Sequence, residues 1–200
     1  SFYYTPGDAV GVALVGNFAY VAASNSGLRV INVSDPSEPI ETSFCDAPPG
    51  LTSGVDMVGN FAYVSDGTNG VRVIDISNPF GPTQVGSYDT PGHPRGVAST
   101  GNPAYVADDS SGLRVINVSD PTHPIEVSFY DTQGSAYDVT LAGSYCYIAD
   151  GADGLRVINV SNPFQPTEAG FYVTPGTARS VVVVASFAYV ADASDGLRLV

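Results

Sequence analysis

The tetrapeptide Gly112-Leu113-Arg114-Val115 decides the fold of this chain of 200 residues, because close copies of it recur along the whole sequence. The other copies stand at 27–30, 70–73, 154–157 and 196–199. Successive copies are 43, 42, 42 and 42 residues apart, and a tyrosine and a glycine elsewhere in the period recur at the same steps. Such self-similarity at a fixed period indicates a repeat architecture.

One period contains four β-strand patterns separated by turn residues. In the third repeat these patterns are 97–100, 104–107, 113–118 and 125–130. Turn-forming glycine, asparagine and aspartate separate the first three, and two prolines precede the fourth, because proline cannot donate into a strand ladder. Four short antiparallel strands in roughly 40–45 residues are typical of a β-propeller blade. A parallel β-helix is the weaker alternative, since its coils are shorter.

The repeats predict an all-β propeller of about five four-stranded blades in a single domain that covers residues 1–200. The alternative is that these residues are a fragment of a longer chain. The expected blades are 8–50, 51–92, 93–134, 135–176, and 177–200 plus 1–7. The last blade has only three strand patterns, whereas residues 1–7 align with the fourth strand at 128–134. We therefore expect the N-terminal strand to complete the last blade of its own chain, since effective concentrations favour intramolecular pairing. Donation of that strand to a neighbouring copy is the alternative.

The composition excludes several classes of protein. The chain has 20 acidic residues against 7 basic ones, all arginine, for a net charge of −13. Nucleic-acid binding requires clustered lysine and arginine, and an anionic membrane surface attracts the same residues, so both partners are disfavoured. No stretch of the sequence is long and apolar enough for a membrane span.

The third strand of each repeat also resembles a known family. The pattern Leu-Arg-Val-Ile-(Asn or Asp)-(Val or Ile)-Ser stands at 28–34, 71–77, 113–119 and 155–161, with a shortened copy at 197–200. It is similar to the LVIVD-repeat family of predicted propellers in bacterial and archaeal surface or secreted proteins. In three copies asparagine replaces the aspartate of the family pattern, which only Asp75 keeps. The resemblance implies a propeller at the cell surface or outside the cell, and it implies no reaction.

Two columns of charged residues recur with the repeat and predict structural ion pairs. We expect the arginines of the third strand to pair with the aspartates that end the second strand, because a guanidinium group suits a partly buried carboxylate. The expected pairs use Arg72, Arg114, Arg156 and Arg198 with Asp66, Asp108, Asp150 and Asp192. Ala23 interrupts the aspartate series in the first blade, so Arg29 needs another partner.

A column that varies between blades is the candidate for ligand binding. Inner strands of a propeller line its central channel, so the loops before them surround the channel mouth. The residues there with binding chemistry are Asp8, His93, Arg95, Tyr137, Asp138 and Arg179. Ordinary variation of exposed loops is the competing interpretation.

Two further motifs carry weaker signals. Asn32, Asn117 and Asn159 stand in Asn-Val-Ser sequons, which accept N-linked glycans in secreted proteins but also cap turns. The Asp-Gly turns between the second and third strands offer at most two carboxylates each, too few for calcium. We predict neither a metal site nor a cofactor.

Catalytic motifs are scarce. His93 and His123 are the only imidazoles, and no nucleophile elbow, phosphate-binding loop or His/Cys cluster is present. Cys45 and Cys146 lie in different columns of the repeat and are expected to be thiols.

The predicted function is therefore a non-enzymatic, extracellular or cell-surface propeller that binds or scaffolds a protein or glycan partner. A structural subunit of an extracellular filament, assembled by strand donation, is the first alternative. A hydrolase or lyase with its site at the channel mouth, using Asp8 and Asp138, is the second.

Overall fold

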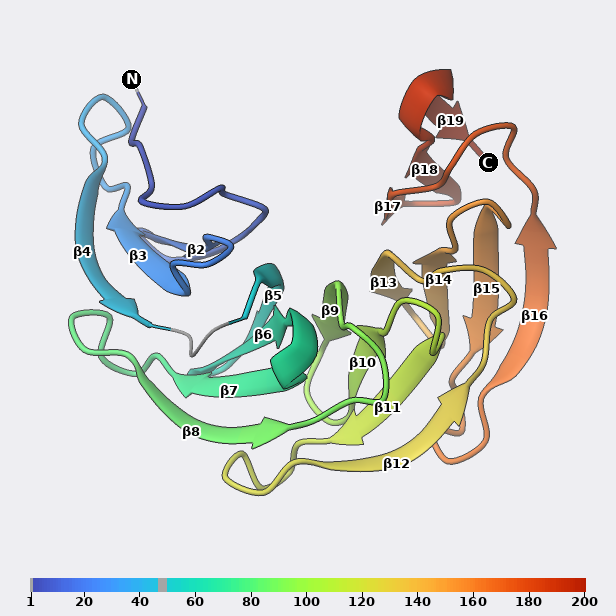
Figure 1. Ribbon diagram of the computed structural model, residues 1–200, viewed down its shortest axis with the longest axis horizontal. Coiled ribbons are helices and arrows are strands. Elements are labelled where there is room, and N and C mark those ends of the chain that lie inside the picture. Colours follow the sequence, from blue (N-terminus) through green and yellow to red (C-terminus); the bar gives the residue numbers. More distant parts are fainter. Residues whose placement is uncertain (1, 47–49) are drawn as a thin grey trace.

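The computed structural model describes residues 2–46 and 50–200, which form five antiparallel β-sheets around a common centre (Figure 1). Each sheet consists of strands that are consecutive in the chain, so each sheet is one blade. The described residues contain no α-helix, only the 3-10 turns η1 (Gly67–Asn69) and η2 (Ala193–Asp195). The prediction of an all-β, five-bladed propeller is confirmed.

The strands follow the repeat. Blade 1 contains β1 (Gly11–Val15), β2 (Phe18–Ala22), β3 (Leu28–Asn32) and β4 (Ile40–Cys45). Blade 2 contains β5 (Thr52–Val58), β6 (Phe61–Asp66), β7 (Val71–Asp75) and β8 (Thr83–Tyr88). Blade 3 contains β9 (Gly96–Ser99), β10 (Ala104–Ala107), β11 (Leu113–Asn117) and β12 (Ile125–Tyr130). Blade 4 contains β13 (Asp138–Ala142), β14 (Tyr145–Ala149), β15 (Leu155–Asn159) and β16 (Thr167–Tyr172). Blade 5 contains β17 (Ser180–Val184), β18 (Phe187–Ala191) and β19 (Leu197–Leu199).

The third strand of a blade ends at a side-chain cap and carries a bulge. In blade 3 the Asn117 carboxamide oxygen accepts the backbone N–H of Ser119 at 3.0 Å, which turns the chain out of β11. The register between β11 and β12 shifts between Val115 and Ile116, and blades 1, 2 and 4 shift at the equivalent residues. A bulge increases the bend and twist of a strand, which curves the outer edge of each blade.

The hydrophobic core lies between blades and is repeated at each junction. Leu155 in β15 belongs to a cluster with Val181 of β17 and Val190 of β18, in the next blade. Leu113 of blade 3 and Leu28 of blade 1 occupy the same place at their junctions. The third strand of one blade therefore packs on the first two strands of the next.

Backbone bridges reinforce three of the four junctions. A residue in the turn after the second strand pairs with a residue two positions before the next inner strand, or with the first residue of that strand. These isolated antiparallel bridges are Ser24 with Thr52, Asp109 with Ala136, and Gly151 with Ala178. At the junction between blades 2 and 3, Pro94 stands where the other junctions have Ala136 or Ala178, and proline has no N–H to donate to a bridge.

The completion of blade 5 by the N-terminal strand is a prediction that the structure contradicts. The sheet β17–β18–β19 has three strands, and residues 2–5 form no strand, while Ser1 lies outside the described residues. The physical reason is that residues 2–5 stay with blade 1, where the Tyr3 hydroxyl donates to the Glu41 carboxylate at 3.0 Å. Figure 1 shows blade 1 and blade 5 facing each other across an opening.

The two blades beside this opening expose side chains whose equivalents in the other blades are buried or partly buried. Val12 in β1 is 65% exposed, whereas the equivalent Val181 is 3% exposed. Leu197 in β19 is 69% exposed, whereas the equivalent Leu155 is 2% exposed. We call the surface around Val12 and Leu14 the head face, and the surface around Leu197 and Leu199 the tail face.

Candidate functional site

The repeated arginines lie beside the predicted aspartates inside each blade. Arg72 donates from Nε to the Asp66 carboxylate, and the Nε atoms of the other three arginines lie 3.4–3.8 Å from theirs. Those three pairs are Arg114–Asp108, Arg156–Asp150 and Arg198–Asp192. All four aspartates are fully buried, and burial raises the pKa of the Asp108 and Asp150 carboxyls despite the neighbouring guanidinium groups. In blades 2 to 5 the column therefore ties the second strand to the third.

Three of the buried aspartates, Asp108, Asp150 and Asp192, also bind the turn that enters their blade. The Asp150 carboxylate accepts the Thr132 hydroxyl at 2.7 Å and the Gly134 backbone N–H at 3.1 Å. Thr174 and Gly176 make the same two bonds to Asp192. In blade 1, where Ala23 replaces the aspartate, Arg29 lies 3.6 Å from Glu41 and 3.7 Å from Asp46.

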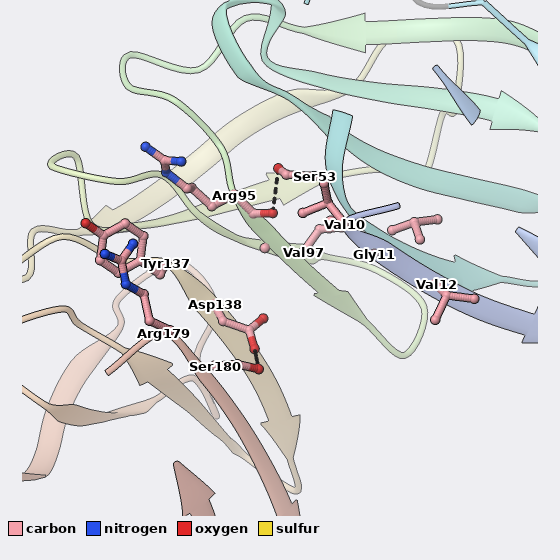
Figure 2. Close-up of a pocket in the computed structure, with 13 residues that line it drawn as sticks. Val10, Gly11, Val12, Ser53, Arg95, Val97, Tyr137, Asp138, Arg179 and Ser180 are labelled. Carbon is pink, nitrogen blue, oxygen red and sulfur yellow. Dashed lines mark hydrogen bonds between the residues drawn. The ribbon is translucent and has the colours of Figure 1, made fainter. Parts of the chain in front are cut away.

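The channel mouth contains a cavity of about 470 Å³ that is lined by the inner edges of all five blades (Figure 2). Four of the six residues predicted there line it: Arg95, Tyr137, Asp138 and Arg179. Asp8 and His93 are exposed and lie outside its lining. The blades approach closely here, because a Cβ on Gly54 would come within 2.5 Å of the Arg95 carbonyl oxygen.

Two arginines from different blades stack on one aromatic ring. The guanidinium carbon of Arg179 lies 4.5 Å from the centroid of the Tyr137 ring, and that of Arg95 lies 5.4 Å from it. Arg95 also donates to the Asp109 carboxylate from Nη2 at 2.8 Å and from Nε at 3.1 Å. A ring face attracts cations, so Tyr137 holds both side chains at the mouth.

Asp138 is a partly buried carboxylate in the same cavity. It accepts the Ser180 hydroxyl at 2.6 Å and the Val181 backbone N–H at 3.1 Å, both from blade 5. Burial raises its pKa, and these hydrogen bonds oppose the shift. Asp138 thus joins blade 4 to blade 5 at the cavity wall.

The raised pKa of Asp138 predicts a specific pH dependence. The folded protein binds the Asp138 proton more tightly than the unfolded chain, whose pKa is near 3.8. Between that value and the higher folded pKa, the free energy of unfolding falls as pH rises, because folding then takes up a proton from solution. Melting temperatures of the wild type minus those of Asp138→Asn should therefore decrease as pH rises from about 4. A difference that grows over that range would contradict the shift.

The remaining predicted residues fall at separate places. The side chains of Asn32, Asn117 and Asn159 each accept the backbone N–H two residues later, at 2.9–3.0 Å, which is the turn-capping alternative to glycosylation. Cys146 is buried and Cys45 is partly buried, and both are free thiols. Within residues 2–46 and 50–200, no group of three or more His, Cys, Asp or Glu side chains is placed to hold a metal ion.

The sequence reasoning missed Ser53, Ser180 and the glycines of the cavity wall. Ser53 donates to the Arg95 carbonyl oxygen at 2.9 Å, which links blade 2 to blade 3 beside the cavity. The available signal was the column of small residues at Gly11, Gly54 and Gly96, where the inner strands approach each other.

These features define a class of protein, a β-propeller built from five copies of one repeat. The chain belongs to the LVIVD repeat family, whose repeat matches residues 6–47, 49–90, 91–132, 133–174 and 175–200. No curated protein matches the chain. Among the described residues, no helix is long and apolar enough to cross a membrane.

Solved structures share the fold at low sequence identity. A functionally unknown protein from Desulfotomaculum acetoxidans DSM 771 superposes with a TM-score of 0.79 and 15% identity, covering 94% of this chain and 64% of that one. The computationally designed protein Ika8 gives 0.75 and 7%, covering 94% and 56%. BamB from Moraxella catarrhalis gives 0.73 and 10%, covering 98% and 58%. The chain thus spans 56–64% of these three proteins, and the likeness concerns the fold alone.

Proposed function

We propose that this protein is a non-enzymatic scaffold whose copies join head to tail, the head face of one copy seated on the tail face of the next. The observation that carries the proposal is the exposure of Val12 and Leu197, whose equivalents at the internal junctions are buried, apart from the partly buried Val55. Large exposed apolar surfaces mark interaction sites. The family resemblance supports a location at the cell surface or outside the cell.

The internal junctions supply the geometry for this contact. At the last junction, Leu155 packs in one cluster with Val181 and Val190. Leu197 is the repeat equivalent of Leu155, and Val12 and Val21 are the equivalents of Val181 and Val190. The head and tail faces are therefore two halves of an interface that the chain already forms four times. Burying one Val or Leu contributes about 1.5–3 kcal/mol, so a few such residues suffice for association.

The backbone at the two faces is complementary as well. Ala193 is equivalent to Asp109 and Gly151, and Ala9 is equivalent to Ala136 and Ala178. Those equivalents pair through two backbone hydrogen bonds of 2.9–3.2 Å at each junction. The proposed contact would form the same bridge between Ala193 of one copy and Ala9 of the next.

Residues 2–5 occupy the position of a fourth strand that belongs to a preceding blade. The Tyr3 hydroxyl donates to Glu41 in blade 1, just as the Tyr130 hydroxyl of blade 3 donates to Glu168 in blade 4, at 3.4 Å. Tyr3 is the repeat equivalent of Tyr130. The segment thus lies where it would meet the edge of β19 in a docked copy, completing that blade by strand donation.

The ring stacked on the repeated arginines points to the same pairing. Phe44, Phe129 and Phe171 lie 4.6–5.0 Å from the guanidinium carbons of the arginines in their own blades. Phe2 is their repeat equivalent and is exposed, while Arg198 has no stacked ring among the described residues. Docking would place Phe2 of one copy over Arg198 of the other. Because the contact is heterologous, it generates a ring or a filament, depending on whether its rotation closes.

A disulfide between copies tests the proposed contact. Residues paired through two antiparallel hydrogen bonds have Cα atoms about 5.5 Å apart, within the disulfide range. We would make Ala9→Cys and Ala193→Cys separately, with Cys45→Ser and Cys146→Ala to remove the native thiols. Mixing the two variants under mild oxidation should give a covalent dimer, and each variant alone should not. The readout is non-reducing electrophoresis.

The variant carrying both new cysteines separates two modes of closure. Contact between copies predicts a ladder of covalent multimers from this double variant. A compact monomer with an internal disulfide would show instead that the chain closes on itself, and the proposal would then be wrong. Absence of any cross-link, together with a monomeric mass in solution, would also overturn it.

A further inference from the structure

The two arginines outside the repeated column meet at one place. Five of the seven arginines belong to the column that pairs with blade aspartates or glutamates. The other two, Arg95 and Arg179, come from blades 3 and 5 and lie over the same ring of Tyr137. The chain has a net charge of −13, and the two arginines outside the repeated column both lie at the channel mouth.

Arg179 differs from the other six arginines in its partners. Each of those six lies within ion-pair distance of at least one carboxylate. Within the described part of the chain, no carboxylate lies at that distance from Arg179, and its guanidinium is exposed at the cavity rim. Figure 2 shows its side chain lying along the Tyr137 ring, from the opposite side of the cavity to Val12. The stack orients a planar group of donors without neutralising it.

The rest of the cavity wall carries little competing charge. The one acid among its described lining residues, Asp138, is turned toward blade 5 by the Ser180 hydroxyl and the Val181 N–H, and burial raises its pKa. The remaining wall consists of small residues and valines from blades 1 to 3. A volume of about 470 Å³ lies within the range of small-molecule sites.

We propose that this cavity binds a sugar-sized organic carboxylate, such as a hexuronic acid, with Arg179 as the group that recognises the carboxylate. A planar guanidinium binds a carboxylate through two parallel hydrogen bonds. One uncompensated cation matches one negative charge, whereas a phosphate dianion would need a second, and Arg95 is already paired with Asp109. The cavity shares Val12 with the head face, but Arg179, the recognising group, lies on the opposite side of the cavity from Val12.

Binding of sodium galacturonate to the full chain tests the assignment, with calorimetry and ligand-observed NMR as readouts. Galactose has the same ring without the carboxylate, and inorganic phosphate is an anion without the ring. We expect saturable binding of galacturonate, at least tenfold weaker binding of both galactose and phosphate, and weakening by added salt. Equal binding of galactose would remove the role of the carboxylate, and equal or tighter binding of phosphate would show a general anion site. No binding of galacturonate would overturn the proposal.

Variants of the rim assign the role to Arg179. Arg179→Gln should weaken galacturonate binding at least tenfold, and Arg179→Lys should recover only part of the loss, because an ammonium group lacks the planar pair of donors. Thermal unfolding should be unchanged, since Arg179 makes no ion pair with described residues. His93→Gln is the matched control, as an exposed loop residue outside the lining, and should bind as the wild type does. Equal affinity in Arg179→Gln and the wild type would disprove the assignment.

Discussion

Asp150→Ala should lower the free energy of unfolding by about 3–5 kcal/mol, the usual cost of removing one partner of a buried ion pair. The Asp150 side chain is fully buried, accepts the Thr132 hydroxyl and the Gly134 N–H, and lies 3.4 Å from Nε of Arg156. Its loss leaves two donors without their acceptor and the Arg156 guanidinium without its buried carboxylate. For a chain of this length, the melting temperature should fall by roughly 6–20 °C, measured by calorimetry or circular dichroism.

Asp153→Ala is the matched control, because Asp153 lies 3.6 Å from the same arginine but is partly exposed. Exposed ion pairs contribute about 0–1 kcal/mol, so the melting temperature should move by only a few degrees. Similar losses in the two variants would mean that the repeated aspartate is no more than one of several surface partners of the arginine.

The internal repeats explain why so much of the fold could be predicted from one sequence. They provide five versions of a blade, so a residue kept in every version, such as the arginine at 114, identifies itself as architectural. The predicted strands of the third repeat differ from β9–β12 by at most one residue at either end. The prediction for the third strand ran to Val118, because its β-branched side chain fits a strand, but the Asn117 cap turns the chain one residue earlier.

Closure of the propeller could not be predicted in the same way. Equivalence between repeats shows that the head face and the tail face are complementary. The same complementarity allows a chain to close on itself or to join a neighbouring copy. The deciding contact is local, since Tyr3 bonds to Glu41 in blade 1 and leaves β19 unpaired by any described strand. A high effective concentration favours closure only where the two ends can meet, and the arrangement of the blades keeps the two end faces apart.

For the cavity, the repeat indicates which residues are close to an inner strand, but the contacts between their side chains depend on the geometry of the blades. Arg95, Tyr137, Asp138 and Arg179, which the sequence places before or at the start of an inner strand, line one cavity. Asp8 and His93, from a neighbouring position of the repeat, are exposed and lie outside the lining. Stacking of two arginines on Tyr137 depends on distances across three blades, for which a single sequence contains no signal.

Val12→Asp and Leu197→Asp should each abolish assembly while leaving the monomer folded. Each substitution places a carboxylate where the proposed contact buries an apolar side chain, and an unpaired buried charge costs several kcal/mol. At 1.4 kcal/mol per tenfold, association should weaken at least a hundredfold. In the monomer both positions are exposed, so the melting temperature of the isolated chain should change little. Light scattering and electron microscopy would measure the loss.

Mixing the two variants is the decisive experiment, because a head-to-tail contact uses different surfaces on its two partners. Val12→Asp retains an intact tail face, and Leu197→Asp retains an intact head face. Together they should form a one-to-one dimer that grows no further, although each alone is monomeric. Phe164→Asp is the matched control, since Phe164 is as exposed as Leu197 but lies in a loop away from both faces, and it should assemble normally. If the mixture stays monomeric while the wild type assembles, the copies associate through other surfaces and the head and tail faces have no role in it.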